Sequence, residues 1–187
     1  MTTGPVRWSL ATRVLHWLSA ACIATMLVLG VYMVWFVDDA ARRFDLYQRH
    51  KALGVFVFAL AAARITVRAA TRSRGWPHRM SRLHRAAAGG AHAALYALMF
   101  AATLTGYAMV STSPLPLPLA LPGGWTVPNL LAADYAASER WKIAHHACVL
   151  ALGLLAAGHA GVALWRHFVD RDDVLSRMGF GKRAASP

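Results

Sequence analysis

Five histidines stand in or at the edges of long apolar stretches of this 187-residue chain: His16, His50, His92, His145 and His159. An ionisable side chain is costly inside a membrane and therefore marks a candidate functional site there. Imidazole is a strong ligand for haem iron, and two imidazoles on opposite faces of one haem give an electron-transferring centre. The chain has no C-x-x-C-H sequence for covalent haem attachment. The histidines therefore predict non-covalently bound b-type haem, provided that their spacing forms pairs.

The spacing of four of these histidines does form pairs. His145 and His159 are 14 residues apart, which on a helix places them on nearly the same face and about 21 Å apart along the axis. His16 opens the first apolar stretch and His50 opens the second, so the two lie near opposite sides of the membrane. Matching by depth predicts an outer pair, His50 with His145, and an inner pair, His16 with His159.

Other residues lie at helical spacing from these histidines and would fit the same two haem sites. Arg64 follows His50 by 14 residues, which places it on the same helix face but near the inner side. There its guanidinium is expected to pair with a propionate of the inner haem. Gly54, one turn from His50, would let a flat macrocycle approach the backbone. Gly30 and Gly106 are expected near the outer side, where the outer haem needs room.

Other roles for the histidines stay open. His92 lies at the inner depth, where it could replace His16 as a ligand or donate a proton to a quinone. His146 is the nearest rival of His145, but its 13-residue offset turns it away from the face of His159. Intramembrane histidines also form hydrogen bonds between helices, and in that case the protein would be haem-free. Zinc fits less well, because these histidines lack the Cys and carboxylate neighbours of most zinc sites. Three histidines are expected in loops or at the interface: His78, His84 and His167.

The composition indicates that membrane helices position these residues. Hydrophobic residues make up 57% of the chain and charged residues 15%, with a mean hydropathy of +0.40. This excludes a disordered chain and argues against an ordinary soluble domain. Cys22 and Cys148 are expected to be free thiols in the core. Four stretches can cross a bilayer, approximately residues 14–37, 51–67, 86–110 and 143–165. The predicted fold is all-α, one membrane domain over 1–187 in which four helices enclose two b haems.

The positive charge is better explained by membrane topology than by nucleic acid. Lys and Arg number 20 against 8 Asp and Glu, but they fall between the apolar stretches instead of forming one soluble basic face. Most lie at the two termini and in the second loop, and fewer lie in the first and third loops. Because short cytoplasmic loops are enriched in Lys and Arg, both termini are predicted to be cytoplasmic.

The third loop differs from the others in composition. Residues 111–131 contain a Gly123-Gly124-Trp125 turn and several prolines, which exclude a regular helix. Such an apolar segment on the outer side suits a lid lying on the membrane surface. A simple connector is the alternative. The prolines are Pro114, Pro116, Pro118, Pro122 and Pro128.

At these residues the chain resembles the bacterial cytochrome b561 family, over nearly its whole length. The resemblance implies a cytoplasmic-membrane protein of four helices and two b haems, with His16, His50, His145 and His159 as the axial iron ligands. The proline- and leucine-rich third loop departs from the family's pattern. The matching residues are Arg13-Val14-Leu15-His16-Trp17, His50, Gly54, Arg64, Arg68, His92, Tyr96, Gly106, Lys142, His145, His159 and the tail 170–178 (DRDDVLSRM).

The resemblance also implies the activity. Family members pass electrons between the quinone pool and a second redox partner, and one subgroup is associated with oxidising superoxide at the outer face and reducing ubiquinone. A basic outer rim would attract such a small anion, although the same residues are ordinary flanking charges of helix ends. The rim residues are Arg49, Lys51, Arg140 and Lys142, and the candidate proton donors to a quinone are His92, Lys142 and Asp134.

Two functions follow for a protein of the bacterial inner membrane. The first is a quinone-linked oxidoreductase, most specifically a superoxide:ubiquinone oxidoreductase. The second is a membrane-anchoring cytochrome b subunit that relays electrons between quinol and a docked redox partner.

Overall fold

The structure, a computed structural model, describes residues 8–71, 81–115, 117–121 and 123–179. Four long helices occupy most of it: α1 (Leu10–Trp35), α2 (Ala40–Ala70), α3 (Arg82–Ser111) and α4 (Tyr135–Phe168). All four are long and apolar enough to cross a membrane. A short hairpin, β1 (Leu119–Ala120) and β2 (Thr126–Val127), lies between α3 and α4, and α5 (Val174–Arg177) follows α4. The predicted all-helical membrane bundle is therefore confirmed.

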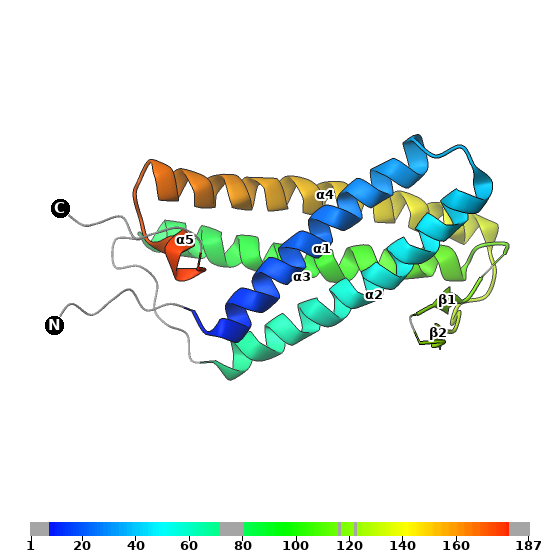
Figure 1. The fold of residues 1–187 in the computed structure, drawn as a ribbon, viewed down its shortest axis with the longest axis horizontal. Coiled ribbons are helices and arrows are strands. Elements are labelled where there is room, and N and C mark those ends of the chain that lie inside the picture. The colour runs from blue at the N-terminus through cyan, green and yellow to red at the C-terminus, as the bar shows by residue number, and fades with distance from the viewer. Residues whose placement is uncertain (1–7, 72–80, 116, 122, 180–187) are drawn as a thin grey trace.

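The four helices form two antiparallel hairpins that pack across each other (Figure 1). α1 packs on α2, α2 on α3, and α3 on α4. α1 begins and α4 ends at one end of the bundle, which is called here the terminal end. β1 and β2 lie at the opposite end, called here the hairpin end. The first and last described residues, Trp8 and Gly179, both lie at the terminal end, as an even number of spanning helices requires.

The helices are longer than the apolar stretches that predicted them. α2 begins before residue 51 and α4 before residue 143, because each has an N-cap further upstream. The carboxylates of Asp39 and Asp134 accept the backbone N–H three residues on, at 2.7 and 3.0 Å. The first turns of these helices are charged and lie beyond the bilayer core. They are helical but not apolar, so the apolar pattern does not include them. Basic residues that the sequence placed in the first and third loops therefore lie on helices: Arg42, Arg43, Arg49, Lys51, Arg140 and Lys142.

A small core lies midway along the bundle, and every long helix contributes to it. Its residues are Cys22, Val57, Leu60, Ala61, Met99 and Leu152. Both cysteines are free, as predicted. The outward faces are apolar as well, as is expected of helices that contact lipid. Trp35, at the hairpin end, is 78% exposed, and Trp165, at the terminal end, is 61% exposed. Tryptophan at both ends of a bundle is typical of the two membrane interfaces.

Candidate functional site

Two histidines of different helices meet at the hairpin end. The ring centroids of His50 on α2 and His145 on α4 are 6.5 Å apart, with the ring planes at 82°. Glycines on the other two helices make room for them. A Cβ on Gly30 would lie 3.5 Å from Cε1 of His50, and a Cβ on Gly106 would lie 3.0 Å from Cε1 of His145. The structure thus brings the predicted outer pair together and places both glycines against it.

A second pair lies at the terminal end. The ring centroids of His16 on α1 and His159 on α4 are 6.3 Å apart, with the planes at 65°. His92 on α3 is also close, with its ring centroid 5.3 Å from that of His159. The terminal end therefore gathers three imidazoles, of which the sequence predicted two as a pair and the third as a rival.

The separations distinguish which imidazoles can share one iron. A metal–imidazole bond is about 2 Å and the ring centre lies about 1.2 Å beyond the nitrogen, so two in-line ligands have centroids about 6.4 Å apart. His50–His145 at 6.5 Å and His16–His159 at 6.3 Å fit this value. His92–His159 at 5.3 Å is too short. The geometry therefore favours His16 over His92 as the partner of His159.

His146 also lies near His145, but it faces another way. Their ring centroids are 6.2 Å apart, but adjacent residues leave a helix about 100° apart around its axis. His145 is partly buried, whereas His146 is exposed. His146 therefore stays outside the pair, as its offset predicted.

A backbone carbonyl sets the tautomer of His145. Its Nδ1 lies 2.9 Å from the carbonyl oxygen of Ala102 on α3. Because a carbonyl only accepts, Nδ1 carries the proton and donates, which leaves the lone pair of Nε2 free to bind a metal. Sequence reasoning missed Ala102, since a backbone acceptor leaves no trace in the side-chain pattern.

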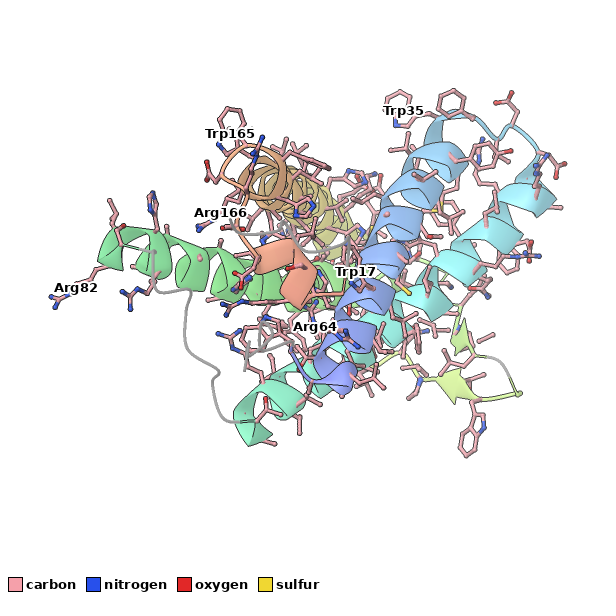
Figure 2. All side chains as sticks on the ribbon, turned by 60° about the vertical axis from the view of Figure 1, so that its left-hand side comes forward. Trp17, Trp35, Arg64, Arg82, Trp165 and Arg166 are labelled. Carbon is pink, nitrogen blue, oxygen red and sulfur yellow. The ribbon has the colours of Figure 1, made fainter. Side chains whose placement is uncertain are left out.

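Arg64 lies at the terminal end, where its spacing predicted it (Figure 2). Its Nη2 is 3.1 Å from Nδ1 of His16, and its guanidinium stands over the ring of Tyr96, 5.2 Å from the centroid. A guanidinium only donates, so in this arrangement Nδ1 of His16 accepts. An imidazole that binds iron through Nε2 has its proton on Nδ1. Arg64 must then turn to another acceptor, and a propionate carboxylate would provide one.

The other predicted site residues do not gather at one place. Gly54 is buried, and its nearest neighbour for an added Cβ is Cε of Met26 on α1, at an ordinary 3.7 Å. Lys142 is an exposed residue of the hairpin end, paired with Glu139 at 2.7 Å. His92 lies at the terminal end, with its buried Nδ1 lacking a partner among the described residues. Lys142 and His92 therefore cannot serve one quinone site.

The basic rim at the hairpin end is partly neutralised. Lys142 pairs with Glu139, and Arg49 pairs with Asp45 at 2.9 Å. Neither Lys51 nor Arg140 forms an ion pair with any described residue. The attraction that this rim can exert on an anion therefore rests mainly on these two residues.

The third loop is a braced hairpin, not a helix, as its prolines predicted. β1 packs beside α2, and β2 pairs with β1 (Figure 1). Gly123 and Gly124 form the turn with φ of +84° and +80°, a region that favours glycine. The hydroxyl of Tyr107 donates to the Pro128 carbonyl at 2.8 Å and accepts from the Leu130 N–H at 2.9 Å. Apolar side chains point outward from this frame, among them Trp125, 75% exposed.

Of the remaining histidines, His84 is exposed as expected but lies in the first turn of a helix and not in a loop. His167 is half-buried against Phe168, with ring centroids 4.9 Å apart. His78 lies outside the described residues. So do several basic residues used in the topology argument: Arg7, Arg72, Arg74, Arg79, Lys182 and Arg183.

The donor sets are pairs, and pairs suit haem. In the described part of the chain, no three His, Cys, Asp or Glu side chains are placed so that they could hold one metal ion, and this includes the three imidazoles of the terminal end. Haem iron takes four ligands from the porphyrin and needs only two from the protein, whereas zinc takes three or four. Four membrane-spanning helices with a histidine pair towards each end are the arrangement of a membrane cytochrome b.

Comparison with known proteins agrees with this class. The family described as prokaryotic cytochrome b561 matches residues 7–181. Cytochrome b561 homolog 2 of Escherichia coli (strain K12) is 30% identical over 177 residues, which cover 95% of this chain and 93% of that protein. The chain therefore belongs to the prokaryotic cytochrome b561 family, membrane electron carriers that bind b-type haem, as the sequence predicted.

Gly106 provides a direct test of the hairpin-end pair. Gly106→Ala is expected to lower haem content, because its Cβ would press within 3.0 Å of the His145 ring. Gly89→Ala on the same helix is the matched control, since a Cβ there meets nothing within 4 Å. Removing a helical glycine should stabilise α3 slightly, by about 0.5–1 kcal/mol. The haem-to-protein ratio of both purified variants checks this, and a wild-type ratio in Gly106→Ala would contradict the close packing.

Proposed function

We propose that this protein binds two b haems, one between His50 and His145 and one between His16 and His159, and carries electrons across the membrane to or from the quinone pool. The observation that supports this most strongly is the match of both ring separations, 6.5 and 6.3 Å, to a shared iron. The 14-residue spacing on α4 puts the pairs about 21 Å apart along the helix. Electrons can thus enter near one side of the membrane and leave near the other.

The protein residues have distinct tasks in this proposal. Bound haem supplies reversible one-electron chemistry at its iron. The carbonyl of Ala102 orients His145 and fixes its tautomer. Arg64 places a positive charge beside the terminal-end pair. The apolar core between the pairs keeps water and ions away from the path.

The terminal end is proposed to face the cytoplasm of a bacterium, with the protein in the inner membrane. The excess of Lys and Arg in the segments that meet at this end supports this orientation. The hairpin end, with β1 and β2, would then face the periplasm.

Superoxide is the proposed electron donor, and ubiquinone the acceptor. Two superoxide anions would each lose one electron to become dioxygen, and the two electrons with two protons would convert ubiquinone to ubiquinol. Lys51 and Arg140 at the hairpin end would raise the encounter rate with the anion. His92 could supply a proton to a quinone at the terminal end, and Lys142 to one at the hairpin end. Asp134 is engaged as the N-cap of α4.

Stopped-flow mixing with superoxide tests this donor. The expected result is rapid haem reduction, followed by reoxidation when a short-chain ubiquinone is added. Lys51→Ala with Arg140→Ala should slow the first phase several-fold at low ionic strength and less at high salt. If ubiquinol reduces the haems and superoxide does not, the donor assignment is wrong.

The second candidate is a membrane anchor that relays electrons between quinol and a docked redox protein. The braced hairpin with outward apolar side chains, such as Trp125, favours it, because it could form a docking surface at the hairpin end. Trp125→Ala would then weaken electron transfer to the partner protein. It would leave reduction by superoxide unchanged.

Arg64 is expected to raise the reduction potential of the terminal-end haem, because a nearby positive charge favours the reduced iron. Arg64→Leu should lower that potential by roughly 50–100 mV, the effect of one partly screened charge. Arg64→Lys, which keeps the charge, is the control and should stay nearer to the wild-type value. A redox titration followed in the α band measures both. An unchanged potential in Arg64→Leu would contradict this role.

A further inference from the structure

We propose that the segment after α4, residues 169–179, is a latch that positions His16 against His159. Sequence reasoning used this tail as a point of resemblance and counted its arginines toward the membrane topology. It joins the two helices that carry this pair, α4 at its end and α1 at its beginning. The inference rests on the proposed ligand role of the two histidines.

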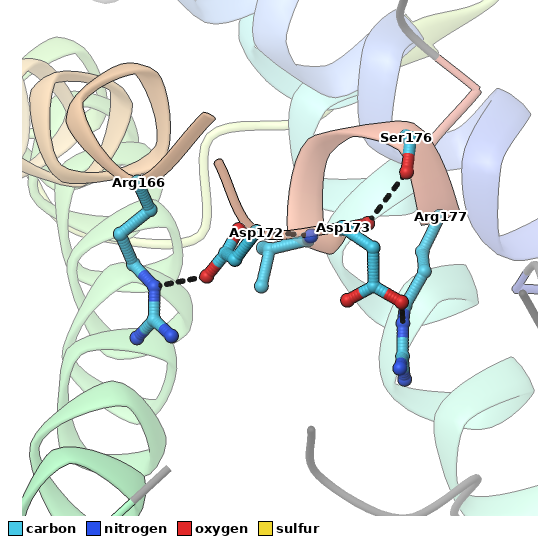
Figure 3. Close-up of polar contacts among 6 residues, drawn as sticks. Arg166, Asp172, Asp173, Ser176 and Arg177 are labelled. Carbon is cyan, nitrogen blue, oxygen red and sulfur yellow. Dashed lines mark hydrogen bonds and ion pairs between the residues drawn. The ribbon is translucent and has the colours of Figure 1, made fainter. Parts of the chain in front are cut away.

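The latch is fixed to α4 by an ion pair between Arg166 and Asp172 (Figure 3). Arg171 adopts a positive φ of +53° in the turn. Nε of Arg166 then donates to Oδ2 of Asp172 at 2.5 Å, and the two side chains are only 21% and 18% exposed. The other oxygen of Asp172 accepts the N–H of Val174, the first residue of α5, at 3.1 Å. One carboxylate thus joins α4 to α5.

The far end of the latch is fixed to α1. The indole Nε1 of Trp17 donates to the carbonyl of Met178 at 3.0 Å, and the N–H of Trp8 donates to the carbonyl of Arg177 at 3.2 Å. Between these ties Leu175 and Ser176 are buried. Segments that follow a last long helix are poorly ordered unless they are tied down, and residues 172–178 are tied at several points.

Its last described residue also packs on α1. Gly179 has a positive φ of +88°, and a Cβ there would lie 3.1 Å from Nη1 of Arg13. The backbone conformation therefore favours glycine at this position. The first two turns of α1 are thus held along one side by the latch.

These contacts act on His16 through its neighbour. Trp17 follows His16 directly, and their rings meet edge to face with centroids 5.2 Å apart. A shift or rotation of the start of α1 would move both residues together. A metal ligand must be held within about 0.5 Å of its productive position. The latch therefore acts as a positioning device for the terminal-end pair and leaves the hairpin-end pair unaffected.

Asp172→Asn tests this in the full-length protein in lipid nanodiscs. Asparagine keeps the shape of the side chain but loses the charge that holds Arg166. Hydrogen exchange of residues 10–17 should rise about tenfold, as loss of a charged hydrogen bond allows. The low-spin EPR signal of the terminal-end haem should shift, while that of the hairpin-end haem stays at its wild-type position.

The matched control is Asp173→Asn. Asp173 also pairs with an arginine, Arg177 at 2.8 Å, but that pair joins the N-cap of α5 to its last residue and does not reach α4. Its loss should change neither readout by more than a small fraction of the Asp172→Asn effect. The charge-swapped double variant Arg166→Asp with Asp172→Arg should restore both readouts in part, because the swap re-forms the ion pair but leaves the N–H of Val174 without its acceptor.

Two results would overturn the proposal. Unchanged exchange in Asp172→Asn would show that the segment does not hold α1. Raised exchange with an unchanged EPR signal would show that it holds α1 without positioning His16. Failure of the ligand assignment itself is distinguishable, because His16→Ala would then keep both haems, whatever the exchange of residues 10–17.

Discussion

His145→Ala is expected to remove one of the two haems and to leave the other spectrally intact. His145 is one of the two imidazoles at the hairpin end, and a haem that keeps only His50 loses half of its axial ligation. The terminal-end pair, His16 and His159, does not include His145 and lies about 21 Å away along the helix. The ratio of haem to protein should therefore fall from about two to about one, with one component of the α band lost.

Two companion variants sharpen this experiment. His50→Ala should remove the same spectral component as His145→Ala, because the two rings form one site, with their centroids 6.5 Å apart. His146→Ala should keep both haems, since that residue is exposed on another face of α4. Wild-type haem content in His50→Ala or His145→Ala would refute the pairing. Loss of a haem in His146→Ala would transfer the ligand role to that residue.

His16→Ala is expected to remove the terminal-end haem, whereas His92→Ala retains it. Both residues neighbour His159, but only His16 stands at the separation that a shared iron requires, 6.3 Å against 5.3 Å. Haem content and the α band of the two variants give the answer side by side. The hairpin-end component should persist in both and so acts as an internal reference.

The reverse outcome would be equally informative. If His92→Ala loses the haem and His16→Ala keeps it, His92 is the ligand. The contact of Arg64 with Nδ1 of His16 would then be a permanent hydrogen bond, because His16 would have no need of a proton on Nδ1. Arg64→Leu would in that case affect His16 alone.

The site was largely predictable because helices are rigid and periodic. A 14-residue spacing fixes both the face and the depth of a side chain. The amino-acid sequence alone therefore sufficed to match His145 with His50 and His159 with His16. The same spacing rule predicted glycines near the outer pair, and Gly30 and Gly106 do lie against the rings of His50 and His145.

The errors came from features that the apolar pattern does not record. Helix starts were placed too late, because the N-caps Asp39 and Asp134 precede charged turns outside the bilayer core. His92 and Lys142 stay separate candidate proton donors, because the structure places them at opposite ends of the bundle. Gly54 proved to pack against a methionine of α1, and whether a macrocycle approaches it stays a prediction.

Backbone partners could not be predicted at all. The carbonyl of Ala102 sets the tautomer of His145, and the carbonyl of Met178 holds the indole of Trp17. Every residue carries such a carbonyl, so its role depends on tertiary position and leaves no sequence signal.

The most direct test of the central claim is a reduced-minus-oxidised spectrum of the purified protein with a pyridine haemochrome count per chain. Two histidine pairs predict about two b haems per polypeptide and an α band with two components. A preparation with one haem per chain would contradict one of the pairs. A colourless protein would contradict both and return the histidines to packing between helices.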